Sequence, residues 1–167
     1  LYDAAAIDAR IDALKAGLGG RRARVCYAVK ATSSRAILAR IATAGLGADI
    51  VSEGEMRRAL AAGFRPADIV FSGVGKTREE IEAALEHGVG RFNAESIEEL
   101  DLLDALAAAR GITAAVALRI NPDVDAQTHA KISTGRAENK FGVALDQARA
   151  IFRAAARWPA LRIDGLP

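Results

Sequence analysis

The segment Arg24-Val25-Cys26-Tyr27-Ala28-Val29-Lys30-Ala31 is a mostly apolar run that ends at a lysine, and Thr32-Ser33-Ser34 then opens what reads as a helix. A continuous apolar run with polar boundaries predicts a strand buried on both faces, as in a parallel sheet. Lys30 would then lie at the carboxyl end of a core strand. A lysine in that place either extends its stem to carry the charge to water, or is desolvated and held as a nucleophilic amine.

The same strand-then-helix unit repeats along the rest of the chain. Apolar residues at three- and four-residue spacings predict the helices, and glycines follow them as stops. The predicted helices are 4–18, 35–44, 53–62, 78–86, 97–110 and 145–158, and the predicted strands are 24–30, 48–52, 68–72, 90–94, 114–121 and 161–167. This alternation predicts an α/β fold with a parallel sheet.

Two parallel folds fit this order of elements. A doubly wound sheet usually carries a glycine-rich turn after its first strand, and none follows Lys30. A (β/α)8 TIM barrel places its site residues at the carboxyl ends of its strands. The polar residues at those positions are Lys30, Ser52, Ser72, Asn93 and Asn121. We therefore predict a (β/α)8 barrel. A complete barrel needs eight strands and roughly 250 residues, so we expect a partial barrel of about six strands and a fragment of a longer protein.

The composition is that of an ordinary globular domain. About half of the residues are hydrophobic (51%), a quarter are charged (26%), and the net charge of +2 comes from interspersed residues rather than a basic block. The single cysteine, Cys26, excludes an internal disulfide, and no His or Cys spacing predicts a metal site. No apolar run reaches the ~18 residues of a membrane span, and no signal peptide opens the chain. We expect a soluble, cytoplasmic protein that binds neither nucleic acid nor membrane nor metal.

The sequence Gly75-Lys76-Thr77 resembles the end of a phosphate-binding P-loop. That motif needs a glycine five residues before Gly75, where this chain has Val70. We therefore interpret Thr77 as a helix cap, in a capping box with Glu80. Lys76 is interpreted as a solvated loop charge.

Charged residues inside predicted strands are candidates for a site. Asp49 lies in a strand near the barrel mouth, where an ionised carboxylate needs a partner. Arg119 lies in the apolar run 115–120 and must be paired or point into a polar mouth. It either bridges to a core acid such as Asp49 or orients an anionic or phenolic ligand oxygen, and the sequence leaves both open. Glu53 and Glu55 are explained instead by the helix dipole, because they lie in a first turn.

The polar segment 122–142 breaks the rhythm of the chain. It is far longer than the usual connection between a strand and a helix. Long loops in compact domains are more often functional, so we interpret it as a candidate lid or binding loop. From spacing alone, His129 within it reads as an exposed loop histidine.

Several segments together resemble the alanine-racemase-like barrel decarboxylases that use pyridoxal phosphate, and most closely the branch that acts on diaminopimelate. They occur in the family's order across nearly the whole chain. They are 27–31 (YAVKA), 51–55 (VSEGE), 71–77 (FSGVGKT), 92–96 (FNAES), 119–125 (RINPDVD), and 128–142, with its TH, ISTG and KFG pieces. The last is the most specific, because it separates diaminopimelate decarboxylases from ornithine and arginine decarboxylases.

The resemblance implies the cofactor and the site residues. Lys30 would carry pyridoxal 5'-phosphate as an internal aldimine, Ala28 and Asp49 would line the pocket, and Arg119 would contact the ring region of the cofactor. The implied reaction is the decarboxylation of meso-2,6-diaminopimelate to L-lysine. The substrate amine would displace Lys30, the ring would delocalise the resulting carbanion, and the released lysine would shuttle a proton.

Two other functions stay open. A related decarboxylase of another basic or carrier-bound amino acid would share these segments, and a non-catalytic homologue that binds the cofactor would keep the barrel. The resemblance also implies that phosphate-binding segments and a second, β-rich domain lie outside residues 1–167, and that this domain completes the neighbouring subunit's site. We therefore expect the chain alone to be inactive, and the full-length protein to be a homodimer with shared active sites.

Overall fold

The computed structural model describes residues 2–121 and 141–166. Within these ranges a parallel sheet has six strands in the order β1-β2-β3-β4-β5-β8. The strands are β1 (Cys26–Ala28), β2 (Gly47–Ile50), β3 (Ile69–Phe71), β4 (Arg91–Ala94), β5 (Ala114–Leu118) and β8 (Leu161–Gly165). A short ladder pairs β6 (Ile120–Asn121) with β7 (Val143–Ala144). Parallel strands in sequential order are the arrangement of a (β/α)8 barrel, so the predicted partial barrel is confirmed.

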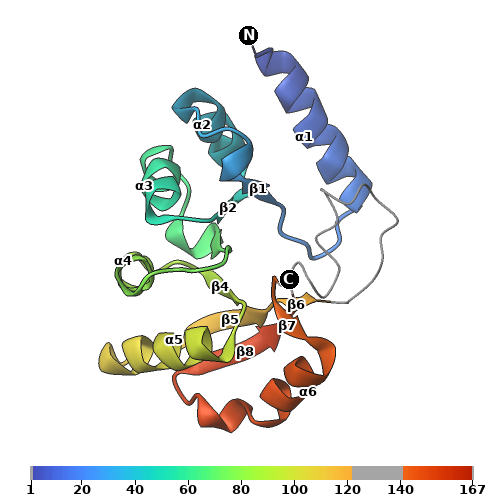
Figure 1. Cartoon of the computed structure of the whole chain (residues 1–167). Coiled ribbons are helices and arrows are strands. Elements are labelled where there is room, and N and C mark those ends of the chain that lie inside the picture. The colour runs from blue at the N-terminus through green and yellow to red at the C-terminus, as the bar shows by residue number, and fades with distance from the viewer. Residues whose placement is uncertain (1, 122–140, 167) are drawn as a thin grey trace, which may run out of the picture.

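Helices follow the strands along one side of the curved sheet (Figure 1), where α2 contacts α3, α3 contacts α4, and α4 contacts α5. The helices are α1 (Ala4–Leu18), α2 (Arg35–Thr43), α3 (Glu53–Ala61), α4 (Arg78–His87), α5 (Ile97–Ala109) and α6 (Leu145–Arg153). Three 3-10 turns are η1 (Val29–Ala31), η2 (Pro66–Asp68) and η3 (Ala155–Arg157). Side chains that cap helix N-termini are those of Asp3, Ser52, Thr77 and Ser96. The capping box of Thr77 and Glu80 is present as predicted.

The two faces of the sheet differ in burial. Phe71, Phe92 and Val116 are aligned in register across β3, β4 and β5, and all three are fully or nearly fully buried. Asp49 and Asn93 point to the opposite face and stay partly exposed. The first strand was expected to be buried on both faces, but all three residues of β1 are partly exposed, and that expectation is wrong. In β5, by contrast, the consecutive residues Val116, Ala117 and Leu118 are all buried.

Two boundaries differ from the prediction for identifiable reasons. The first strand ends at Ala28 rather than Lys30, because the backbone turns into η1. The helix predicted over 145–158 ends at Arg153, and η3 follows. This change of direction brings Trp158 into the core, where its Nε1–H donates to Asp101 of α5 at 2.7 Å.

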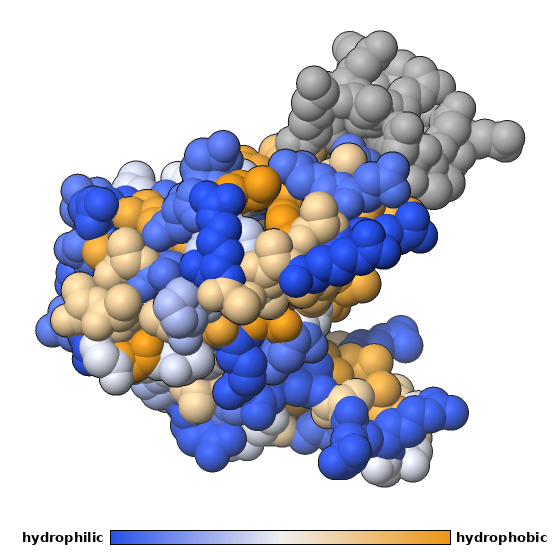
Figure 2. All heavy atoms as spheres, turned by 90° about the horizontal axis from the view of Figure 1, so that it is seen from below, coloured by the Kyte–Doolittle hydropathy of each residue, from blue (hydrophilic) through white to orange (hydrophobic). Residues whose placement is uncertain are grey.

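Surface charge is interspersed, as the sequence predicts. Figure 2 shows one face of the molecule on which hydrophobic side chains lie among charged ones. No helix in the described ranges is long and apolar enough to cross a membrane. Most of the candidate lid 122–142, including His129, lies outside the described residues.

Candidate functional site

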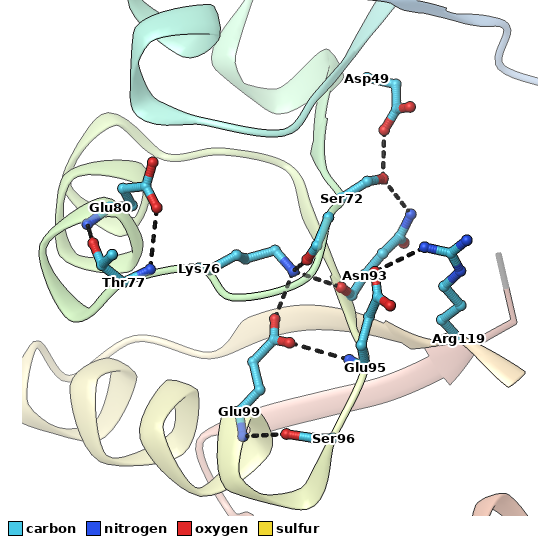
Figure 3. Close-up of polar contacts among 11 residues, drawn as sticks. Asp49, Ser72, Lys76, Thr77, Glu80, Asn93, Glu95, Ser96, Glu99 and Arg119 are labelled. Carbon is cyan, nitrogen blue, oxygen red and sulfur yellow. Dashed lines mark hydrogen bonds and ion pairs between the residues drawn. The ribbon is translucent and has the colours of Figure 1, made fainter. Parts of the chain in front are cut away.

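Polar side chains meet at the carboxyl ends of β2, β3 and β4 (Figure 3). Asp49 of β2 accepts a hydrogen bond from the hydroxyl of Ser72, which directly follows β3. Asn93 of β4 donates from Nδ2 to the same hydroxyl oxygen at 2.8 Å. Asp49 is aligned with Val70, so Ser72 lies one step further along the same face of the sheet. The partner that Asp49 was expected to need is therefore a serine hydroxyl, itself held by an amide.

Arg119, just beyond β5, pairs with an acid that the sequence did not single out. Its Nη1 donates to Oε1 of Glu95 at 2.9 Å, and its guanidinium carbon lies 5.3 Å from the ring centroid of Phe141. Of the two alternatives for Arg119, the bridge to an acid is observed, with Glu95 in place of Asp49. Arg119 pairs with Glu95 rather than Asp49 because β3 and β4 lie between β5 and β2, the strand that carries Asp49. Contact with a ligand oxygen stays a prediction.

A close backbone approach supports Arg119. Gly142 has a φ of +83°, and a Cβ at this position would lie 2.6 Å from the carbonyl oxygen of Arg119. Val143 N–H donates to that carbonyl at 2.8 Å. A larger residue at 142 would push the two segments apart, so the glycine allows the short β6–β7 ladder to form beside the site.

Lys30 lies on η1, immediately after β1. Ala28, two residues before Lys30, is the register partner of Asp49. The lysine and the aspartate therefore come from adjacent strands and lie towards the carboxyl ends of those strands. Lys30 is exposed and makes no hydrogen bond or ion pair with another described residue. Of the two alternatives for Lys30, the described residues show the one in which the charge reaches water, because β1 is an edge strand of the described sheet.

Lys76 was predicted to be a solvated loop charge, and that prediction is wrong. Its side chain is 1% exposed, and its ammonium donates to the carbonyl oxygens of Gly73 and Asn93, both at 2.8 Å, and to Glu99 at 2.6 Å. These three bonds use all three donors of the ammonium. The second oxygen of Glu99 accepts the backbone N–H of Glu95 at 3.1 Å. Burial raises the pKa of Glu99, against the opposing effect of the ammonium.

The buried pair of Lys76 and Glu99 therefore holds the end of β4 in place. One partner binds the carbonyl of Asn93 and the other binds the N–H of Glu95, and those two residues reach Ser72 and Arg119 with their side chains. The sequence contains one signal for this arrangement. Ser96 and Glu99 have the spacing of a capping box, which indicates an acid near the start of the helix after β4.

The residues at this edge are suited to bind an aldehyde that also carries an anionic oxygen. A primary amine condenses with an aldehyde, and a guanidinium donates hydrogen bonds to an anionic oxygen. Ala28, the register partner of Asp49, contributes only a methyl group at this edge. In the described ranges, no group of three or more His, Cys, Asp or Glu residues is arranged to hold a metal ion.

Comparison with known proteins gives consistent matches. The family model described as "Pyridoxal-dependent decarboxylase, pyridoxal binding domain" matches residues 4–167. The chain is 55% identical over 150 residues to a diaminopimelate decarboxylase of Zymomonas mobilis, covering 90% of this chain and 36% of the relative. It is 52% identical over 166 residues to that of Pseudomonas aeruginosa, covering 99% of this chain and 40% of the relative. The chain thus spans about 40% of the length of such relatives.

Solved structures agree with the sequence matches. The diaminopimelate decarboxylase of Helicobacter pylori complexed with L-lysine has a TM-score of 0.93 and 44% identity, covering 99% of this chain and 42% of that one. An ornithine decarboxylase of Entamoeba histolytica has a TM-score of 0.78 at 21% identity, covering 99% and 41%. The second likeness shows a shared fold alone.

Proposed function

The chain belongs to the pyridoxal-dependent decarboxylase family, and on that premise we propose that the whole protein decarboxylates meso-2,6-diaminopimelate to L-lysine with pyridoxal 5'-phosphate. The observation that carries this proposal is a contrast in identity. Relatives named diaminopimelate decarboxylase reach 55% identity, whereas the solved arginine and ornithine decarboxylases are 21–22% identical.

Lys30 supplies the amine that binds the cofactor aldehyde in this proposal. Its place after β1 and its lack of a partner among the described residues support that role, because an unpaired amine is free to react. When bound, pyridoxal phosphate provides the electron sink for the carbanion left by the departing carboxylate. The Nζ of Lys30, when it is not bonded to the cofactor, would carry a proton to the α carbon of the substrate.

Ala28, Asp49 and Arg119 complete the cofactor site from this chain. The register of Ala28 with Asp49 supports a shared pocket wall, and the Ser72 hydroxyl fixes the direction of the Asp49 carboxylate. Arg119 is proposed to contact the ring region of the cofactor. In support, its guanidinium keeps donors beyond the one bonded to Glu95. The amine, the carboxylate and the guanidinium therefore fit the proposed cofactor.

The remaining parts of the proposal concern the whole protein. Residues 1–167 form the first part of a cofactor-binding barrel, and the substrate- and phosphate-binding segments and a β-rich domain lie outside them. The coverage of about 40% of the relatives' length supports this division. We also propose a cytoplasmic homodimer in which two subunits share each site. Light scattering of the purified whole protein tests the dimer, and a monomer with full activity would overturn it.

The decisive experiment compares Lys30→Ala with the wild-type whole protein. The wild type should bind pyridoxal phosphate with a visible absorbance band and release carbon dioxide from diaminopimelate, and Lys30→Ala should lose both. Lys15→Ala is the matched control, because Lys15 is exposed on α1 and bonds the Ala44 carbonyl.

Each other result overturns a defined part of the proposal. Release from ornithine or arginine instead would overturn the substrate. A bound cofactor without turnover would indicate a non-catalytic homologue. A visible band that persists in Lys30→Ala would remove the lysine's role.

A further inference from the structure

Glu95 is a buried carboxylate with one oxygen left unpaired. Its side chain is 5% exposed, and Oε1 accepts the hydrogen bond from Arg119. Oε2 is buried and has no hydrogen-bond partner among the described residues. Burial of a carboxylate without full hydrogen bonding costs free energy. The interaction with Arg119 is the one charged contact of this side chain in the described ranges that offsets the cost.

Arg119 is held on two sides and accessible on another. Glu95 binds one edge of its guanidinium and the Phe141 ring lies against it, yet 41% of the side chain is exposed. A guanidinium has five N–H donors, and the described side chains take one of them. The group is therefore fixed in orientation while donors remain available for a ligand.

We propose that Glu95 is a positioning residue that acts through Arg119. It orients the guanidinium and cancels its positive charge, so that Arg119 donates hydrogen bonds to the ring region of the cofactor without adding a net charge there. This inference rests on the proposed function, because it takes the cofactor as the ligand of Arg119. Among the other charged groups nearby, Lys76 and Glu99 pair with each other, and Asp49 accepts from Ser72. Burial raises the pKa of Glu99 and repulsion by the Glu95 carboxylate adds to that rise, so the charge of Glu99 does not stabilise that of Glu95.

Loss of the negative charge at Glu95 has a predictable electrostatic effect. With the cofactor bound, the Nζ of Lys30 would carry a proton, and loss of that proton would leave the site one charge more negative. An uncompensated guanidinium nearby favours that loss. The visible band of the bound cofactor should therefore titrate at a lower pH in Glu95→Gln than in the wild type, by about one pH unit.

The test is a pH titration of the visible band in the whole protein loaded with pyridoxal phosphate. Glu95→Gln should titrate lower than the wild type and Arg119→Met should titrate higher. The double variant loses both charges of the pair, so it should titrate close to the wild type. Glu98→Gln is the matched control, because it makes the same change on an exposed side chain of α5, and it should titrate as the wild type does. If Arg119 were not the charge that Glu95 cancels, the double variant would titrate as low as Glu95→Gln.

The possible failures are distinguishable. A wild type without a Lys30-dependent band overturns the proposed function itself. A normal wild-type band with Glu95→Gln unchanged, or with a double variant that titrates as low as Glu95→Gln, overturns this inference alone. If Glu95→Gln does not fold, Arg119→Met tests the inference from the other side of the same pair. A titration of Arg119→Met at or below the wild-type pH would also overturn the inference.

Discussion

The hydroxyl of Ser72 joins the side chains of Asp49 and Asn93, because it donates to the carboxylate and accepts from the amide. Hydrogen bonds to a charged group contribute about 1.5–3 kcal/mol. We expect Ser72→Ala to weaken binding of pyridoxal phosphate to the whole protein about tenfold, because Asp49 is no longer held.

Equilibrium dialysis measures this affinity directly. Ser33→Ala is the control, since Ser33 accepts a bond from Arg58 at the protein surface. Unchanged affinity in Ser72→Ala would contradict the role given to this hydroxyl.

Residue type and strand position together were enough to select part of the site. Asp49 and Arg119 stood out because a charge inside an apolar strand needs a partner. The partners themselves were not predictable, since Glu95 lies 24 positions before Arg119 in the chain. The buried state of Lys76 was missed for the same reason, because it depends on Glu99, 23 positions away.

Helix starts are the elements that local chemistry sets most directly. Thr77 accepts the N–H of Glu80 at 3.2 Å, and the Glu80 carboxylate accepts the N–H of Thr77 at 3.1 Å. Loss of such a cap costs about 1 kcal/mol. We expect Thr77→Ala to lower the thermal unfolding midpoint by about 2–4 °C.

The matched control is Ser34→Ala. Ser34 occupies the same position before α2 but makes no side-chain capping bond, so its replacement should leave the midpoint unchanged within about 1 °C. The midpoints are measured by circular dichroism. An equal decrease of the unfolding midpoint in Thr77→Ala and Ser34→Ala would show that the capping box does not stabilise α4.

The buried pair of Lys76 and Glu99 connects the loop after β3 with α5. Removing one partner of such a pair leaves an uncompensated charge and typically costs 3–5 kcal/mol, about what a large cavity costs. We expect Lys76→Met to be strongly destabilised. The double variant Lys76→Met/Glu99→Leu should recover part of the loss, because no buried charge remains.

Urea denaturation of the whole protein ranks these variants. The recovery should be incomplete, because the carbonyl of Asn93 and the N–H of Glu95 lose their partners. A double variant less stable than Lys76→Met would contradict this account of the pair.

Helix bounds were predictable to within a few residues, and strand ends less so. The helix 4–18 was predicted with the bounds that it has, since Asp3 caps it and Gly19 ends it in the left-handed conformation. The strand predicted to reach Lys30 stops at Ala28. A strand ends where its neighbouring strands stop pairing with it. The position of that end depends on residues far away in the chain, so the sequence around the strand does not reveal it.

At the scale of the whole molecule, the repeated alternation of strands and helices predicted the order of the strands in the sheet. The resemblance of several segments predicted the family. The family match over residues 4–167 confirms the resemblance. Side-chain contacts between strands that are not neighbours in the sheet could not be predicted from the sequence. Arg91 of β4 reaches Asp164 of β8 at 2.6 Å, past the intervening strand β5. Such a pair depends on the curvature and register of the whole sheet, which periodicity does not encode.

Asp164 makes the stability of this assembled sheet depend on pH. Hydrogen bonds from Arg162 at 2.8 Å and Arg91 at 2.6 Å lower its pKa, and desolvation opposes them. An acid with a lowered folded-state pKa contributes stability above its unfolded pKa of about 3.9 and loses it as the pH falls through the folded value. We therefore expect Asp164→Asn to be less stable than the wild type at pH 7, with the difference closing below about pH 4.

Thermal unfolding of the whole protein between pH 3 and pH 7 measures this difference. Asp146→Asn is the control, because Asp146 also pairs with an arginine but its side chain is 94% exposed, and exposed pairs contribute little. A gap between wild type and Asp164→Asn that stays constant across this range would mean that ionisation of Asp164 does not stabilise the sheet. A gap that closes on acidification means that ionised Asp164, through its bonds to Arg162 and to Arg91 of β4, stabilises the part of the sheet where β4 and β8 lie on either side of β5.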